Sequence, residues 1–127
     1  MKRTMERTNA DITSAEDWLE RIISDPDQPV VLFGVGWCGF CWSARGMLGR
    51  LGVVFRDLDV ESEEDLQGQN PFEVRRALRE RTGSHTVPQI FIAGHSIGGA
   101  TELASALNSG ALAERLHPLG VTLNPDR

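Results

Sequence analysis

Residues 30–33, Val-Val-Leu-Phe, are the segment that most constrains the fold of this chain. They form a continuous apolar run that lies between Pro29 and Gly34, both residues typical of turns. A strand that is apolar at every position has both of its faces covered, as the central strands of parallel sheets do. The run therefore predicts a buried strand at the centre of an α/β domain.

Helical and strand patterns alternate around this run. An apolar stripe at 3.6-residue spacing predicts a helix over residues 14–23, with Ser14 as its cap and Asp17 completing a capping box. Caps, spacing and turn residues predict four more helices, over residues 39–51, 71–81, 101–107 and 111–116. They also predict three more strands, over residues 53–60, 88–93 and 96–97.

Individual capping and turn residues predict where several of these helices and strands begin or end. Asn70 is expected to cap the helix at 71–81 in a box with Glu73, Thr101 to cap the helix that follows it, and Gly94-His95 to form a tight turn. The order of elements predicts a parallel βαβ unit followed by a hairpin. We expect one domain over residues 14–117, with a flexible polar tail at 1–13 and a second tail at 118–127.

Charge and hydropathy exclude several classes of function. The net charge of −5 argues against nucleic-acid binding, and the arginines of the helix at 71–81 are interleaved with glutamates, which indicates a solvated face. The acidic run at 61–65 is also expected to be solvated surface. No apolar run approaches the ~20 residues that span a bilayer, and the polar N-terminus lacks the apolar core of a secretory signal. We therefore expect a cytoplasmic protein that binds neither nucleic acid nor membrane.

The two cysteines, Cys38 and Cys41, are the chemical candidates in this sequence. In a reducing compartment a C-x-x-C pair favours redox chemistry over a structural disulfide or simple packing. Zinc would need four ligands, and the three histidines have no ligand-like spacing. Cys38 lies where the first strand meets a helix, and a helix N-terminus favours thiolate over thiol. Cys38 is therefore the expected nucleophile and Cys41, one turn later, the shielded resolving thiol.

Three motifs in order resemble the glutaredoxin family: C-G-F-C after the first strand, T-V-P-Q-I-F-I before the hairpin, and G-H-S-I-G-G-A-T-E-L across it. The resemblance extends over residues 14–117. It implies a thioredoxin-like fold, an α/β structure with a four-stranded mixed β-sheet flanked by helices. It also implies a glutathione-dependent thiol–disulfide oxidoreductase that reduces protein–glutathione mixed disulfides and protein disulfides.

The resemblance also implies roles for individual residues. Cys38 and Cys41 match the nucleophile and the resolving cysteine. The residues matching the family's glutathione contacts are Arg75 for the glycine carboxylate, Thr86, Val87 and a cis Pro88 for the cysteine moiety, and Gly99, Thr101 and Glu102 for the γ-glutamyl end. A Gly98-Gly99 pair before a helix start independently suits close approach of a carboxylate to the backbone.

Three departures from the family pattern leave alternatives open. Val35 replaces a family lysine that anchors glutathione, so glutathione binds more weakly unless Arg75 or Arg76 takes over that contact. The sequence W-C-G, which begins at Trp37, resembles the active-site sequence of thioredoxins. It favours a thioredoxin-like protein that is reduced by a reductase instead of by glutathione.

The dipeptide Gly39-Phe40 matches monothiol C-G-F-S relatives that hold a [2Fe–2S] cluster between two subunits. In that alternative the cluster takes the Cys38 thiolate and a glutathione thiolate from each subunit, which gives four ligands. The chain is expected to be a monomer unless such a cluster bridges a dimer. Cys41, at the position of the monothiol serine, argues against this alternative.

Overall fold

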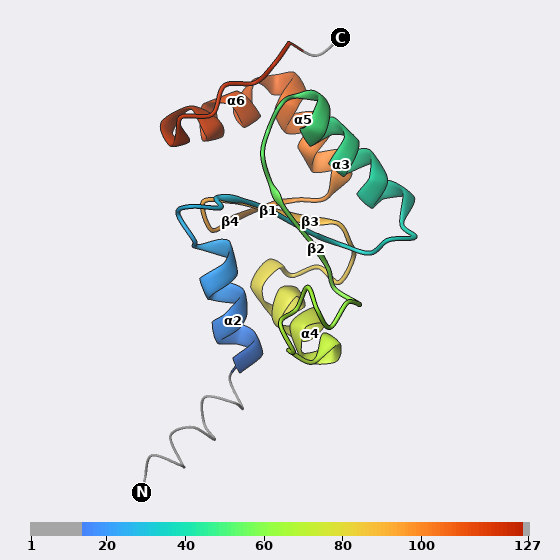
Figure 1. Ribbon diagram of the computed structural model, residues 1–127. Helices are drawn as coiled ribbons and strands as arrows, with labels where there is room; N and C mark the ends of the chain where they lie inside the picture. The colour runs from blue at the N-terminus through green and yellow to red at the C-terminus, as the bar shows by residue number, and fades with distance from the viewer. Residues whose placement is uncertain (1–13, 126–127) are drawn as a thin grey trace, which may run out of the picture.

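The computed structural model describes residues 14–125 and places a four-stranded sheet between two layers of helices (Figure 1). The strands are β1 (Val30–Gly34), β2 (Arg56–Asp59), β3 (Gln89–Ile92) and β4 (His95–Gly98), in the order β2-β1-β3-β4. β1 pairs with β2 in parallel and with β3 antiparallel, and β3 pairs with β4 antiparallel. This mixed sheet confirms the predicted thioredoxin-like fold and its βαβ unit followed by a hairpin.

Helices cover both faces of the sheet. In Figure 1, α2 (Ser14–Ile23) and α4 (Pro71–Thr82) lie on one face, and α3 (Gly39–Arg50), α5 (Ala100–Ser109) and α6 (Ala111–Leu116) lie on the other. Every residue of β1 is buried, as its apolar run predicts. Val31 and Phe33 pack into the core beneath α2 and α4, while Val30 and Leu32 pack into the core beneath α3, α5 and α6.

The ends of α4 follow the predicted chemistry, with one exception. The Asn70 side-chain oxygen accepts hydrogen bonds from the N–H groups of Phe72 and Glu73, at 2.8 and 3.2 Å, and Gly83 ends the helix in the left-handed conformation. The prediction that Glu73 completes a capping box was wrong. Its carboxylate pairs with Arg76 at 2.8 Å, the neighbour three residues along the same helix.

Two strand boundaries differ from the sequence prediction. β2 begins at Arg56 and not at residue 53, because β1 offers partners only from Val31 to Gly34. Val54, in the predicted strand, is instead 85% exposed. The tight turn is formed by Ala93 and Gly94, both with positive φ, and β4 begins at His95. Two consecutive positive φ values fit a hairpin turn whose twist matches the strands.

The segment after α6 was expected to leave the domain as a polar tail, but its described part packs back onto it. A short 3₁₀ helix spans His117–Leu119, and Leu119, Val121 and Leu123 pack against the core beneath α3. The Asn124 N–H then donates to the Leu51 carbonyl at 2.8 Å. The expected tail at residues 1–13 and the side chain of Ser14, the expected cap of α2, lie outside the described residues.

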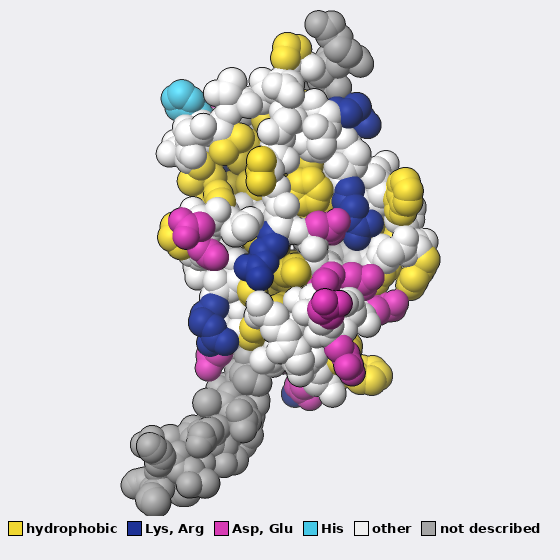
Figure 2. Space-filling view, viewed as in Figure 1, with side chains coloured by type: hydrophobic (Ala, Val, Ile, Leu, Met, Phe, Trp, Pro, Cys, Tyr) yellow, Lys and Arg dark blue, Asp and Glu magenta, His cyan; other side chains and the backbone are white. Residues whose placement is uncertain are grey.

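The acidic run after β2 is exposed at its glutamates, as predicted, but Asp65 is half-buried and its carboxylate accepts the Asp59 N–H at 2.9 Å. Glu61, Glu63 and Glu64 are exposed, and Figure 2 shows acidic side chains gathered on this part of the surface. Among the helices of residues 14–125, none is long and apolar enough to cross a membrane.

Candidate active site

Cys38 lies at the junction of β1 and α3, where the sequence predicts it. Cys38 is the N-cap residue of α3, and its Sγ accepts a hydrogen bond from the Cys41 N–H at 3.2 Å. The thiol is part-buried and can donate to the Val87 carbonyl at 3.8 Å, across the cleft from α3. The sulfur thus takes the place that a serine or aspartate oxygen holds in an ordinary helix cap.

This position lowers the pKa of the Cys38 thiol. Burial alone would raise the pKa, but hydrogen bonds from the Cys41 thiol and from the N–H groups of Cys41 and Phe40 stabilise the thiolate and outweigh it. The positive charge of Arg45 adds to this effect. The hydrogen bond from the Cys41 thiol is the largest single cause that lowers the pKa of Cys38, and the N–H groups of the helix start, which the sequence analysis relied on, come after it. Of the two thiols, Cys38 is the one that ionises more readily.

Cys41 has the opposite environment. Its side chain is fully buried, and burial, the hydrogen bond to Cys38 and the negative charge of Cys38 raise the pKa of Cys41 to about 11. The Val35 N–H and the Arg45 charge act against this rise. A shielded thiol that stays protonated while its neighbour ionises suits a resolving role.

Arg45 is a site residue that the sequence analysis did not identify. It lies on α3 one turn after Cys41, and its charge lowers the pKa of both thiols. The sequence does contain a signal for it, since residues four apart lie on the same face of a helix.

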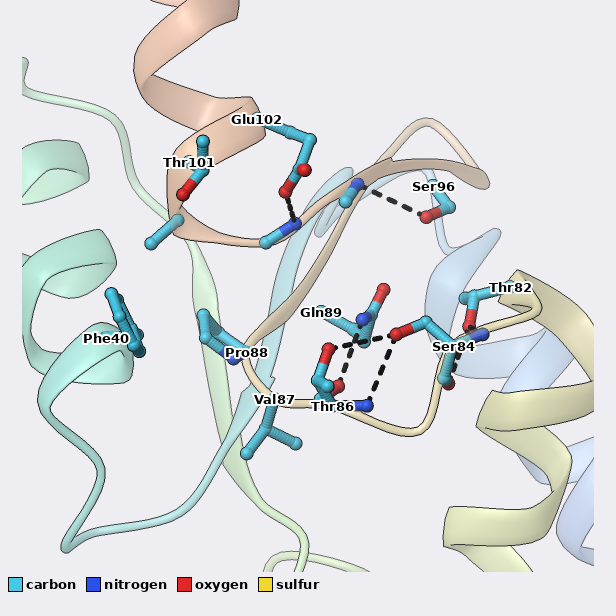
Figure 3. Close-up of a pocket in the computed structure, with 13 residues that line it drawn as sticks. Phe40, Thr82, Ser84, Thr86, Val87, Pro88, Gln89, Ser96, Thr101 and Glu102 are labelled. Atoms are coloured by element: carbon cyan, nitrogen blue, oxygen red, sulfur yellow. Dashed lines mark hydrogen bonds between the residues drawn. The ribbon is translucent and has the colours of Figure 1, made fainter.

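A groove with a volume of about 530 Å³ lies between the start of α3 and the start of α5 (Figure 3), and its lining includes Val87, whose carbonyl faces Cys38. Phe40 forms one wall, Val87 and Pro88 lie along the middle, and Thr101 and Glu102 stand on the far side. The Val87–Pro88 peptide bond is cis, as the resemblance implied. The structure therefore brings six of the seven predicted glutathione-contacting residues together around one groove: Thr86, Val87, Pro88, Gly99, Thr101 and Glu102.

Hydrogen bonds hold the loop that carries Thr86 (Figure 3). The Ser84 hydroxyl lies 2.9 Å from the Thr86 hydroxyl and accepts the Thr86 N–H at 3.2 Å. Gln89, only 3% exposed, donates from its amide to the Thr86 carbonyl at 3.0 Å. The sequence analysis missed Gln89, although a lone polar residue at the start of an apolar strand is the kind of signal that marks a buried hydrogen bond.

The corner between β4 and α5 is built differently from the prediction. Gly99, not Thr101, is the N-cap residue of α5, and Thr101 lies inside the first turn. The Glu102 carboxylate accepts the Gly99 N–H at 2.8 Å and so closes the helix start. Within residues 14–125, no side chain caps the N–H groups of the first turn, and the Thr101 side chain remains exposed.

Arg75 lies outside the groove. Its guanidinium donates to the His85 carbonyl at 3.1 Å, in a neighbouring hollow that also contains Arg76 and Arg79. Val35, at the position of the family lysine, is fully buried in the core beneath α2 and α4.

Comparisons with known proteins agree with this geometry. A family model described as Glutaredoxin matches residues 30–97. Glutaredoxin-C1 of Arabidopsis thaliana is 35% identical over 92 residues, which cover 72% of this chain and 70% of that protein. Monothiol glutaredoxin-S10 of Oryza sativa subsp. japonica is 31% identical over 109 residues, which cover 86% of this chain and 63% of that protein.

A solved structure resembles the whole fold. The crystal structure of the buckwheat glutaredoxin–glutathione complex superposes with a TM-score of 0.76 at 25% identity. The alignment covers 88% of this chain and 96% of the buckwheat chain.

Proposed function

This chain belongs to the glutaredoxin family of thiol–disulfide oxidoreductases, and we propose that glutathione is its reductant. The substrates we propose are protein–glutathione mixed disulfides and protein disulfides. The observation that carries the proposal is the placement of Cys38. Its pKa-lowered thiol faces the Val87 carbonyl at the groove whose far side holds Thr101 and Glu102.

The one-cysteine route needs only Cys38. Its thiolate attacks the glutathione sulfur of a mixed disulfide, the S–S bond breaks, and the protein thiolate leaves and takes up a proton. A second glutathione thiolate then attacks the glutathione sulfur on Cys38, which releases glutathione disulfide and restores the Cys38 thiolate. The helix start that stabilises this thiolate as a nucleophile also stabilises it as a leaving group.

The two-cysteine route adds Cys41 and serves protein disulfides. After Cys38 forms a mixed disulfide with the target, Cys41 loses its proton and attacks Cys38 Sγ. The target leaves as a thiolate, and Cys38 and Cys41 are joined by a disulfide. Two glutathione molecules then reduce this disulfide in turn.

The groove supplies the binding surface for glutathione in this proposal. The backbone at Thr86 and Val87 pairs with the cysteine moiety beside cis Pro88, and the N-terminus of α5 at Gly99, Thr101 and Glu102 receives the γ-glutamyl carboxylate. An anion at the start of a helix meets unpaired N–H groups and the positive end of the helix dipole. Arg75 reaches the glycine carboxylate only if its guanidinium leaves the His85 carbonyl.

The test is the rate at which a small glutathione mixed disulfide is reduced by wild type and two variants. Cys38→Ser should abolish the reaction because no other described thiol is exposed, whereas Cys41→Ser should retain most of it. Turnover with glutathione is compared with turnover with a thioredoxin reductase, the alternative that Trp37 raises. Full activity in Cys38→Ser, or turnover with the reductase alone, would show the proposal to be wrong.

A [2Fe–2S] cluster held by Cys38 is a second candidate function. The space beside Gly39 favours it, because a side-chain carbon placed there would meet no atom within 4 Å. Residues 14–125 contain no group of three or more potential metal-binding side chains, so the remaining thiolates would come from glutathione and a second copy. Anaerobic reconstitution with iron, sulfide and glutathione tests this function, and a colourless monomer would count against it.

A further inference from the structure

Arg45 does not line the proposed glutathione groove; it lies in a separate hollow with Trp42 and Asp57. Its Nε donates to both carboxylate oxygens of Asp57, at 3.0 and 2.9 Å, so the side chain is fixed between α3 and β2. The Arg45 side chain is 22% exposed and the Asp57 side chain 42% exposed. This cation is largely covered by protein, where solvent screens its field less than at an open surface.

The Nη2 end of the Arg45 guanidinium and the sulfur of Cys41 both lie beside Gly34. A side-chain carbon built on Gly34 would lie 2.8 Å from Cys41 Sγ and 3.1 Å from Arg45 Nη2. Both atoms therefore adjoin the same small space over the Gly34 backbone. A side chain at Gly34 would occupy this space next to both the guanidinium and the buried sulfur.

We propose that Arg45, held in place by Asp57, is a positioning residue that stabilises the thiolate of Cys41 and so favours the two-cysteine route. Arg45 does not touch the substrate. Its charge also acts on Cys38, but the inference concerns its effect on Cys41. The inference rests on the proposed function in one respect, that glutathione is the thiol that reduces the Cys38–Cys41 disulfide in the cell. The role of Arg45 in breaking that disulfide does not depend on which thiol attacks it.

The proposal concerns two steps that are the reverse of each other. When Cys41 attacks the mixed disulfide at Cys38, its proton leaves to solvent and negative charge develops on Cys41 Sγ. When an external thiolate attacks Cys38 Sγ of the Cys38–Cys41 disulfide, the S–S bond breaks and Cys41 departs as a thiolate. A thiolate that is better stabilised leaves faster, so a cation fixed beside Cys41 lowers both barriers.

The Cys41 thiolate needs stabilisation by a nearby cation. Because burial raises the pKa of Cys41 to about 11, its thiolate is otherwise unfavourable. Arg45 is one of two groups that oppose the rise, the other being the Val35 N–H. Arginine keeps its charge at all relevant pH values, so its effect does not depend on its own protonation.

The experiment measures how fast dithiothreitol reduces the Cys38–Cys41 disulfide, since this reaction does not involve glutathione. Arg45→Gln should slow it roughly tenfold, which corresponds to ~1.4 kcal/mol of barrier, and Arg45→Lys should recover most of the rate. Arg50→Gln, the same loss of charge at the end of the same helix, is the matched control and should react like wild type. Thermal unfolding of each variant checks that the fold is kept.

Asp57→Asn separates electrostatics from structure. Asparagine keeps a side-chain oxygen that can accept from Arg45 Nε, so the cation stays in place without its counter-charge, and the variant should react at least as fast as wild type. If Asp57→Asn and Arg45→Gln slow the reaction equally, the pair has a structural role only and the inference is wrong. It is equally wrong if Arg45→Gln reacts like Arg50→Gln.

A parallel measurement with glutathione as reductant distinguishes the inference from the proposed function. Suppose that neither wild type nor any variant is reduced by glutathione, while the dithiothreitol rates follow the expected order. The proposed function then fails and the role of Arg45 stands. If wild type turns over with glutathione and the dithiothreitol rates do not differ, the role of Arg45 fails alone.

Discussion

Gly98, at the end of β4, lines the groove at a position where only glycine fits. Its φ is +97°, a value that side chains rarely adopt, and a side-chain carbon there would lie 2.7 Å from Glu102 Cγ. Glu102 in turn holds the N–H of Gly99. The geometry of the α5 start therefore depends on the absence of a side chain at residue 98.

Gly98→Ala should impair both stability and glutathione use. We expect the free energy of unfolding to fall by about 1–3 kcal/mol, as for other non-glycine residues forced into such a conformation. The KM for a small glutathione mixed disulfide should rise, because the displaced Glu102 no longer fixes the α5 N-terminus. Gly49→Ala is the control, since its added carbon meets nothing within 4 Å inside α3 and should stabilise by up to ~1 kcal/mol. Equal effects of the two substitutions would contradict this account.

The residues with chemical roles were partly predictable. Cys38 and Cys41 could be assigned because spacing and position at a helix start already define the nucleophile. The spacing of Arg45, four residues after Cys41, indicates a shared helix face, but the space that both side chains adjoin also depends on the bare backbone of Gly34, which belongs to a different element. Gln89 was missed because its partner, the Thr86 carbonyl, is a backbone group of the preceding loop, which the sequence pattern does not show.

At the scale of elements, α4 depends on the hydrogen bonds at its first turn. The Asn70 side chain satisfies two backbone N–H groups that would otherwise lack partners within the helix. Asn70→Ala should therefore lower the free energy of unfolding by ~1 kcal/mol in chemical denaturation. Asn108→Ala, the same change at an exposed position inside α5, should have no destabilising effect. A similar loss in both variants would rule out the capping explanation.

Element ends were predictable only where one residue decides them. Asn70 and Gly83 define α4 through their own side chain or backbone freedom, so local sequence was enough. The start of β2 was not, because it is set by the length of β1, its only neighbour in the sheet. The predicted start of α5 was wrong because Gly99, which has no side chain to cap the helix, is the N-cap residue, while Thr101, the expected cap, lies in the first turn and faces solvent.

At the scale of the whole molecule, the two thiols dominate the alkaline titration. The sequence contains no tyrosine and one lysine, Lys2, so few other side chains change charge between pH 8 and 11. Cys38 and Cys41 have pKa values shifted in opposite directions by folding. The stability of the reduced protein in this range therefore reports mainly on the cysteine pair.

The stability of the reduced protein should pass through a maximum near the ordinary thiol pKa of ~8.5. The lowered pKa of Cys38 means that the folded state loses its proton first, so stability rises as pH climbs toward that value. The raised pKa of Cys41 means that the unfolded state loses its proton first, so stability then falls until about pH 11. Urea unfolding at several pH values measures this curve. Cys41→Ala should remove the fall on the alkaline side, and an unchanged fall would assign it to other groups.

The three tryptophans are distributed in a way that has a practical consequence. Trp18 is buried and donates to Gln67, whereas Trp37 and Trp42 are 76% and 69% exposed and adjoin Cys38 and Cys41 in sequence. Fluorescence of Trp37 and Trp42 should change when the neighbouring sulfurs pass between thiol and disulfide, while Trp18 responds to unfolding. The protein thus contains its own optical reporter of the state of its sulfurs, and each exchange step can be followed in real time without a label.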